Sequence, residues 1–252
     1  MIRLTDVSIV RGSTLVASPF TLAVGPGESV AVLGRTGSGK TSLVEVIAGV
    51  LTPTTGRAER GEPVAATAHQ PQPNSATGHR PLRIGYAPAE AVAWPVMRMD
   101  EFLEMVGLAA GLVGKPLRLA VDRGLAFADS ADLRQCRLDR LSDGQRKRLL
   151  LAAALLHDPD LLVLDDPVRS LDLLGSGDVE RVVEDLALAG GCVVAALNDG
   201  RVGACWSRVL VLDQGVLFDT AAVQRHPLDS WPAWSRDCLA SWRQARTSQA
   251  SE

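Results

Sequence analysis

The sequence feature that most constrains this chain is a glycine-rich segment between an apolar run and a helical one. Residues 34–41 read Gly-Arg-Thr-Gly-Ser-Gly-Lys-Thr, a complete G-x4-G-K-[ST] pattern. The preceding Ser29–Leu33 predicts a short strand, and residues 41–48 have the apolar spacing of a helix that ends at Gly49. The pattern therefore lies in the strand, loop and helix context that phosphate binding requires, which favours that interpretation over a glycine turn without a ligand.

Each residue type in this loop has a chemical purpose. Glycines let the backbone curl so that successive N–H groups point at phosphate oxygens, and the following helix adds the positive end of its dipole. Lys40 is expected to reach the β- and γ-phosphates, and the Thr41 hydroxyl to ligate Mg²⁺. The predicted nucleotide-binding set is Gly34, Arg35, Thr36, Gly37, Ser38, Gly39, Lys40, Thr41 and Ser42.

Two adjacent carboxylates form a second candidate feature. Residues 161–164, Leu-Leu-Val-Leu, predict a buried strand, and Asp165 and Asp166 follow directly. A phosphate-loop enzyme needs an acid at such a strand end to hold Mg²⁺, usually through water, and we assign this role to Asp165. Asp166 is expected to orient the attacking water. Paired Asp residues also occur in plain turns, but an intact phosphate loop favours the functional interpretation.

Further apolar runs indicate the rest of a sheet. Residues 192–197 are a near-continuous apolar run, as expected of a strand covered on both faces of a parallel sheet, and residues 209–212 are a further strand. Residues 177–188 predict a crossover helix. Residues 1–25 alternate in hydropathy and predict antiparallel strands, with a turn at residues 25–27.

The remaining segments differ in character. Residues 99–156 have a helical pattern. Residues 60–81 hold four prolines and no Leu, Ile or Phe, which predicts a loop or a weakly ordered sheet edge. Three tryptophans near the C-terminus are interpreted as packing anchors of a last helix rather than a partner surface: Trp231, Trp234 and Trp242.

Composition excludes several classes of protein. With 252 residues, 46% hydrophobic and 22% charged, the chain is an ordinary globular protein of one large or two small domains. A net charge of −3 and 4% aromatic residues provide neither a basic face nor a stacking platform for nucleic acid. The basic run at residues 146–148 is interpreted as a solvated helix face.

Cysteine and apolar patterns add two expectations. No two of the four cysteines have the C-x2-C spacing of a zinc site, so we expect reduced thiols in a cytosolic protein. The N-terminus has no apolar signal region, and the longest strongly apolar run is far shorter than the roughly 20 residues of a membrane span. Any role at a membrane is therefore expected to come through a partner.

A third motif carries a family resemblance. Residues 141–145 read Leu-Ser-Asp-Gly-Gln and are followed by Ala-Ala-Ala-Leu at 152–155 and His-Asp-Pro at 157–159. With the phosphate loop and the paired carboxylates, in this order and at these spacings, the chain resembles the ATP-binding subunits of ABC transporters over residues 1 to about 220. The signature of that family is Leu-Ser-Gly-Gly-Gln. Physically, Ser142 and Gln145 also have the spacing of a capping box at a helix N-terminus.

The resemblance implies an α/β phosphate-loop core with a mostly parallel sheet, an antiparallel β subdomain and a helical subdomain at about 88–155. The helical subdomain would dock onto membrane-spanning permease subunits, and residues 221–252 would be a helical or flexible tail. The family binds ATP with Mg²⁺ in a head-to-tail dimer, at the cytoplasmic face of the membrane. Ser142, Gly144 and Gln145 would then bind the γ-phosphate held by the opposite subunit, and residues 170–172 would cross the dimer interface.

Four positions depart from the family pattern. Asp166 stands where the family has Glu, and a carboxylate retracted by about 1.5 Å can cost on the order of 100-fold in rate. Asn198 replaces a histidine and cannot carry a proton as imidazole does. Ala89 replaces the glutamine of the Q-loop, and Glu90 is a candidate substitute near the metal. Arg11 occupies the place of an aromatic that stacks on adenine.

These departures predict retained nucleotide binding and weakened hydrolysis. Two hypotheses remain open: the chain is the slow half of an asymmetric heterodimer, or it forms a slowly hydrolysing homodimer through Asp166. The alternative function is that of a non-transport ABC protein, in which ATP-dependent dimerisation is regulatory or structural. The transported substrate, and import versus export, are not encoded in this chain.

Overall fold

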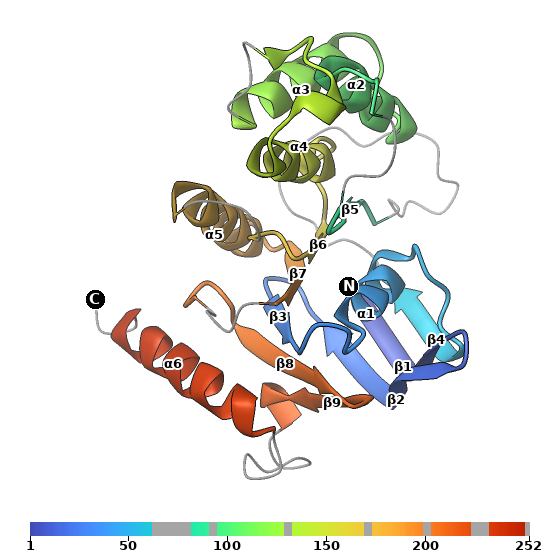
Figure 1. Ribbon diagram of the computed structural model, residues 1–252, viewed down its shortest axis with the longest axis vertical. Helices are drawn as coiled ribbons and strands as arrows, with labels where there is room; N and C mark the ends of the chain where they lie inside the picture. Colours follow the sequence, from blue (N-terminus) through green and yellow to red (C-terminus); the bar gives the residue numbers. More distant parts are fainter. Residues whose placement is uncertain are drawn as a thin grey trace.

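The computed structural model describes residues 1–61, 82–90, 95–128, 133–168, 173–198, 203–222 and 232–249. Two sheets, six α-helices and short 3₁₀ turns make up these parts (Figure 1). The larger sheet has six strands in the order β5-β6-β7-β3-β8-β9. Its strands are β3 (Ser29–Leu33), β5 (Ile84–Ala87), β6 (Leu161–Asp165), β7 (Cys192–Leu197), β8 (Arg208–Asp213) and β9 (Val216–Asp219).

The six-stranded sheet is parallel except for its last pair. The pairs β3–β7, β3–β8, β5–β6 and β6–β7 are parallel, and β9 alone runs antiparallel, to β8. Every residue of β3, β6 and β7 is buried. The apolar runs were therefore correctly interpreted as strands covered on both faces.

Two hydrophobic cores lie on opposite faces of this sheet, because successive side chains of a strand alternate. On one face, Val30 and Val32 pack with helix α1 (Lys40–Ala48) and with the smaller sheet. On the other face, Ala31 and Leu33 pack with helix α4 (Asp143–Leu155) and helix α5 (Leu173–Leu188). The helix α5 begins four residues earlier than the predicted crossover helix at 177–188.

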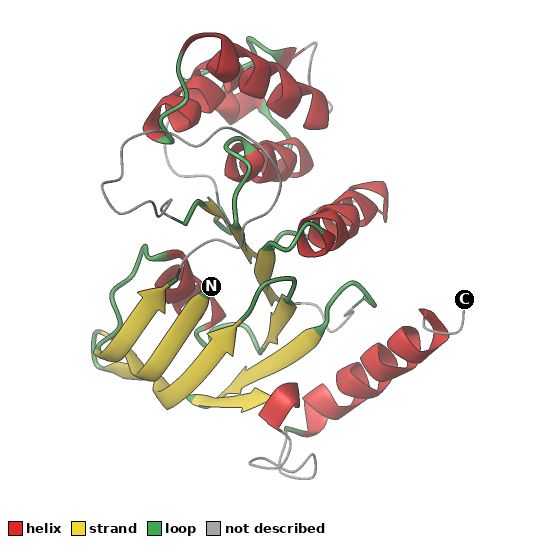
Figure 2. Cartoon of the chain, turned by 180° about the vertical axis from the view of Figure 1, so that it is seen from behind, coloured by secondary structure: helices red, strands yellow, loops and turns green. Residues whose placement is uncertain are grey.

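The smaller sheet is antiparallel, with the order β2-β1-β4 (Figure 2). The strands β1 (Ile2–Arg11) and β2 (Thr14–Val24) confirm the expectation for residues 1–25. The strand β4 (Thr55–Arg60) was not predicted, because its sequence Thr-Gly-Arg-Ala-Glu-Arg has no apolar alternation. The proline-rich segment at 60–81 lies almost wholly outside the described residues.

The helical expectation for residues 99–156 is confirmed as three separate helices, α2 (Met99–Ala109), α3 (Gly114–Phe127) and α4, with a short 3₁₀ turn at Leu138–Arg140. They form the group at the top of Figure 1. The helix α4 lies directly on β5, since a Cβ at Gly85 would overlap the carbonyl of Ala154. The expected α/β class, with an antiparallel unit and a helical group, is therefore confirmed.

A last helix, α6 (Ala233–Gln249), lies beside the β8–β9 end of the sheet. Trp242 is 6% exposed, and its Nε1 donates a hydrogen bond of 2.9 Å to the carbonyl of Trp206. Trp242 therefore packs as predicted, whereas Trp231 is outside the described residues.

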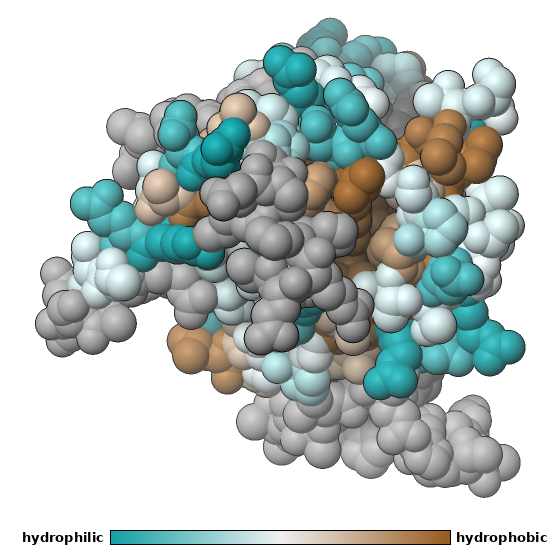
Figure 3. All heavy atoms as spheres, turned by 90° about the horizontal axis from the view of Figure 1, so that it is seen from below, coloured by the Kyte–Doolittle hydropathy of each residue, from teal (hydrophilic) through white to brown (hydrophobic). Residues whose placement is uncertain are grey.

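The surface of the described residues is mixed in character. Seen from below, separate hydrophobic patches lie among hydrophilic residues (Figure 3). In the described parts of the chain, none of the helices is long and apolar enough to cross a membrane.

Candidate functional site

The phosphate loop leaves the end of β3 and enters α1 in a shape that only glycine permits at two points. Gly37 and Gly39 have φ of 81° and 100°, the left-handed region. A Cβ at Gly34 would lie 2.7 Å from the carbonyl oxygen of Leu212, and one at Gly39 would overlap Cγ1 of Val16. The backbone is therefore curled against β2 and β8, as a phosphate cradle requires.

Lys40 is buried inside this loop at 6% exposure. Its Nζ donates hydrogen bonds of 2.7 Å and 3.0 Å to the carbonyls of Gly34 and Arg35. Burial lowers the pKa of Lys40 from its ordinary value, while the carboxylates of Asp166 and Asp165 raise it. The ammonium thus lies where it faces both the cradle and the two acids.

Asp165 ends β6 at 4% exposure, and its Oδ2 has no hydrogen-bond partner among the described residues. Burial raises the pKa of Asp165, a hydrogen bond with Thr41 lowers it, and the neighbouring Asp166 raises it again. A buried carboxylate oxygen without a partner beside a hydroxyl is the oxygen chemistry that Mg²⁺ prefers, so these residues fit the ion. Within the described parts, no group of three or more His, Cys, Asp or Glu side chains could hold a metal.

Asp166 is held from several sides in a left-handed backbone conformation, with φ of 51°. Its N–H donates to the carbonyl of Ala196 at 2.9 Å, and its Oδ2 accepts a hydrogen bond of 2.7 Å from Nδ2 of Asn198. Its own carbonyl accepts a hydrogen bond of 3.0 Å from Nζ of Lys147. Asp tolerates this backbone conformation better than most residues other than glycine. The longer Glu tolerates it less well.

Arg11 lies at the end of β1 against the first turns of α1. Its Nε donates to Oγ of Ser42 at 3.3 Å, and its guanidinium forms an ion pair with Glu45. Arg11 therefore lies beside the predicted phosphate loop. Its ion pair with Glu45 orients the guanidinium. Arg35, Thr36 and Thr41 are exposed at the mouth of the loop.

Glu90 and Ala89 follow β5 and its Pro88. Glu90 is exposed. Its role as a metal ligand stays a prediction. Residues 91–94, which follow it, are outside the described part.

The predicted capping box at the signature is present. Oγ of Ser142 accepts a hydrogen bond of 3.2 Å from the N–H of Gln145, and Oε1 of Gln145 accepts one of 2.9 Å from the N–H of Ser142. Ser142 and Asp143 are exposed, and Gly144 is half-buried. In the described structure no hydrogen bond links Ser142, Gly144 or Gln145 to the phosphate loop of the same chain. Residues 170–172 are outside the described part.

Sequence reasoning missed two charged residues of the site, Glu45 and Lys147. Glu45 raises the pKa of Asp165, and its position in α1 next to the phosphate loop was the available signal. The basic run at 146–148 is not the solvated face that was expected. Arg146 contacts Asp143 and the carbonyl of Leu141, Lys147 reaches Asp166, and Nε of Arg148 is buried.

Comparison with known proteins gives a consistent result. A family model described as ABC transporter matches residues 17–169. The chain is 33% identical over 199 residues to the zinc import ATP-binding protein ZnuC of Roseobacter denitrificans, covering 79% of this chain and 69% of that protein. It is 33% identical over 231 residues to ZnuC of Paramagnetospirillum magneticum, covering 90% and 80%.

Solved structures share the fold. A dimeric bacterial ABC transporter cassette matches with a TM-score of 0.71 at 23% identity, covering 86% of this chain and 96% of that chain. An ATP-binding subunit of an ABC transporter matches with a TM-score of 0.73 at 18% identity, covering 96% and 99%.

Proposed function

Since the chain belongs to the ABC transporter family, as an ATP-binding subunit of the ATPase type, we propose that its own nucleotide site binds ATP well and hydrolyses it slowly. The observation that carries this proposal is the contrast between two adjacent acids. Asp165 keeps a buried oxygen without a partner beside Thr41, whereas Oδ2 of Asp166 is held by Asn198 at 2.7 Å.

The binding half of the site supports ATP and Mg²⁺. The curled loop from Gly34 to Gly39 offers backbone N–H groups, and Lys40 supplies the buried cation that a nucleotide tail needs. Thr41 and Asp165 would hold Mg²⁺, directly or through water. When bound, the ion would neutralise charge on the phosphate oxygens. Arg11 would lie under the base, and Glu90 would substitute for the missing glutamine by a small shift in the loop after β5.

The hydrolytic half is weaker for a geometric and a chemical reason. The Asp166 side chain is one methylene shorter than Glu, so its carboxylate stays further from a water near the γ-phosphate. One of its oxygens already accepts the Asn198 amide, and an amide cannot take up the proton that hydrolysis releases. Asn198 can orient Asp166 or donate a hydrogen bond to a phosphate oxygen. Because neither role removes the proton, we expect hydrolysis to be slow.

The signature supports a dimer in which each nucleotide needs two chains. Ser142, Gly144 and Gln145 lie at the exposed start of α4, where helix N–H groups favour an anion. We propose that they complete a nucleotide site on a second ATP-binding subunit. A heterodimer with a more active partner and a slow homodimer both remain compatible with this arrangement.

The relatives suggest the transport task. Their names describe zinc import ATP-binding proteins, so we propose that this chain energises uptake of a divalent metal through membrane-spanning permease subunits at the cytoplasmic face. The family match favours transport over a purely regulatory or structural ABC protein. Within the chain, residues 1–220 would form the ATP-binding domain, the helical subdomain at about 88–155 would dock the permease, and 221–252 would be a tail.

The first experiment measures ATP binding and turnover of the purified chain with Mg²⁺. We expect tight binding, slow turnover, and loss of both in Lys40→Ala. Asp166→Asn is the matched control for Asp166→Glu, because Asn keeps the tolerated left-handed backbone and removes the charge. A gain with Asp166→Glu and none with Asp166→Asn supports a carboxylate that is too short. Absence of ATP binding in the unaltered chain would refute the proposal.

A second experiment identifies the assembly. The chain is purified from its native membrane under mild detergent, and its partners are identified by mass spectrometry. A permease with a second type of ATPase subunit supports the heterodimer, whereas a permease with this chain alone supports the homodimer. Recovery without any membrane protein would contradict the transport function. Metal uptake into vesicles carrying the complex then tests the substrate class.

A further inference from the structure

Lysine is scarce in this chain, and two of its lysines lie at the nucleotide site. The 26 basic residues include only Lys40, Lys115 and Lys147 as lysines. Lys40 lies in the phosphate loop, and Lys115 is exposed on α3. Lys147 belongs to α4, in the helical group, yet its Nζ donates a hydrogen bond of 3.0 Å to the carbonyl of Asp166. A residue of the signature helix thus contacts the metal-binding end of β6 in the same chain.

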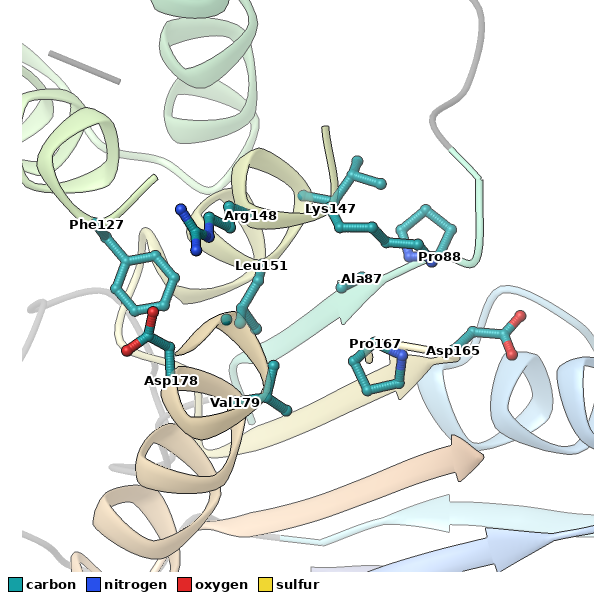
Figure 4. Close-up of a pocket in the computed structure, with 12 residues that line it drawn as sticks. Ala87, Pro88, Phe127, Lys147, Arg148, Leu151, Asp165, Pro167, Asp178 and Val179 are labelled. Carbon is teal, nitrogen blue, oxygen red and sulfur yellow. The ribbon is translucent and has the colours of Figure 1, made fainter. Parts of the chain in front are cut away.

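Figure 4 shows the path of this side chain. Lys147 leaves α4 and extends towards Pro88, and Asp165 and Pro167 lie at the end of the strand below. Lys147, Pro88, Asp165 and Pro167 all line one pocket at the junction between α4 and the sheet. The side chain of Lys147 thus lies between α4 and the end of β6.

Lys147 holds a peptide of the site whose backbone is unusual for a residue other than glycine. Asp166 has φ of 51°, a conformation that non-glycine residues adopt only when neighbours hold them in it. Its N–H and its carboxylate are held by Ala196 on β7 and by Asn198, which follows that strand. Its carbonyl is held from the other side of the junction, by Lys147 on α4.

We propose that Lys147 is a positioning residue that fixes the Asp166 peptide to the signature helix, so that movement of α4 changes the placement of the Asp165 and Asp166 carboxylates. This inference deepens the function proposed above and rests on it.

The consequence is a coupling between two nucleotide sites. The exposed start of α4 carries Ser142 and Gly144, which would contact the nucleotide of a partner subunit, and the same helix holds this chain's Asp166 through Lys147. Nucleotide at the partner's site would bias the position of α4 and thereby the geometry of this chain's carboxylates. Coupling of this kind is reciprocal for binding.

We call the contact between Lys147 and the Asp166 peptide the clamp. Hydrogen–deuterium exchange of the full chain tests this clamp without requiring ATP turnover. Lys147→Met removes the ammonium at similar length, Lys147→Arg keeps a cationic donor, and Lys115→Met is the matched control on an exposed lysine. We expect amide exchange in peptides covering residues 161–168 to be about tenfold faster in Lys147→Met. Lys147→Arg should restore most of the protection, and Lys115→Met should leave it unchanged. Unaltered exchange in Lys147→Met would overturn the proposal.

Two further measurements keep the test decisive. In the unaltered chain, acetic anhydride should acetylate Lys147 about tenfold more slowly than Lys115, because its Nζ is engaged. Equal rates would overturn the clamp even if Lys147→Met failed to fold.

With ATP and Mg²⁺, Lys147→Met should lower kcat and leave KM unchanged, since Lys40 still binds the phosphates. If the unaltered chain binds no ATP, the proposed function fails, whereas exchange and acetylation still decide the clamp.

Discussion

Nδ2 of Asn198 donates a hydrogen bond of 2.7 Å to Oδ2 of Asp166. The two residues are far apart in sequence, but they follow β7 and β6, which are adjacent parallel strands. The carboxyl ends of such strands meet at one edge of the sheet, where ligands of open α/β sheets bind. This single contact fixes the orientation of the residue proposed to activate water, and it does so with a group that cannot accept a proton.

Asn198→Ala should slow the residual ATP turnover on the order of tenfold or more, because Asp166 loses the donor that orients it. ATP binding should change little, since Lys40 and the phosphate loop are untouched. Steady-state turnover and equilibrium binding of a fluorescent ATP analogue check both quantities. Asn198→His is the informative partner variant: if it is no faster than the unaltered chain, proton transfer is not what limits this site.

Gly39→Ala should abolish ATP binding and lower the free energy of unfolding by about 1–3 kcal/mol, because the Cβ meets Val16 and φ is 100°. Gly37→Ala is the matched control, since φ is 81° there but no atom lies within 4 Å of the added Cβ. Urea denaturation and calorimetric ATP binding measure the two effects. Equal losses in both variants would show that backbone strain alone, and not contact with β2, defines the loop.

Gly85→Ala should be severely destabilising, by several kcal/mol, because α4 lies directly on the backbone of β5 at this point. Gly177→Ala on α5 is the opposite control: its added Cβ meets open space, and we expect a gain of about 0.5–1 kcal/mol from helix propensity. Thermal unfolding of the two variants checks the contrast. A Gly85→Ala protein as stable as the unaltered chain would mean that α4 can shift away from β5 at little cost.

The pH dependence of stability should reflect His157. Burial lowers its pKa, and its Nδ1 has no hydrogen-bond partner among the described residues. The unfolded chain therefore binds the proton at higher pH than the folded chain, and the free energy of unfolding falls as pH drops below about 6.5. His157→Gln should flatten urea-measured stability between about pH 7 and pH 5. The raised pKa of Asp165 acts in the opposite sense, because the folded chain then binds that proton more readily than the unfolded chain.

The phosphate loop was predictable because its requirements are local. Glycines that permit left-handed backbone, a lysine and a hydroxyl follow one another within one turn, and the flanking runs define the strand and the helix. The paired acids were predictable for the same reason. Nothing local predicts β4, because Thr55–Arg60 becomes a strand only through pairing with β1.

The sequence by itself determined the α/β class, the nucleotide loop, the position of the two acids and the capped signature helix, since each depends on neighbours in the chain. Only the tertiary structure decided that Asn198 contacts Asp166, that Arg11 pairs with Glu45, and that Lys147 turns inward. In the sequence Lys147 is one of three consecutive basic residues, and charge patterning favours a solvated face. Which of them faces the sheet depends on how α4 docks over Gly85, a packing contact between segments far apart in the sequence.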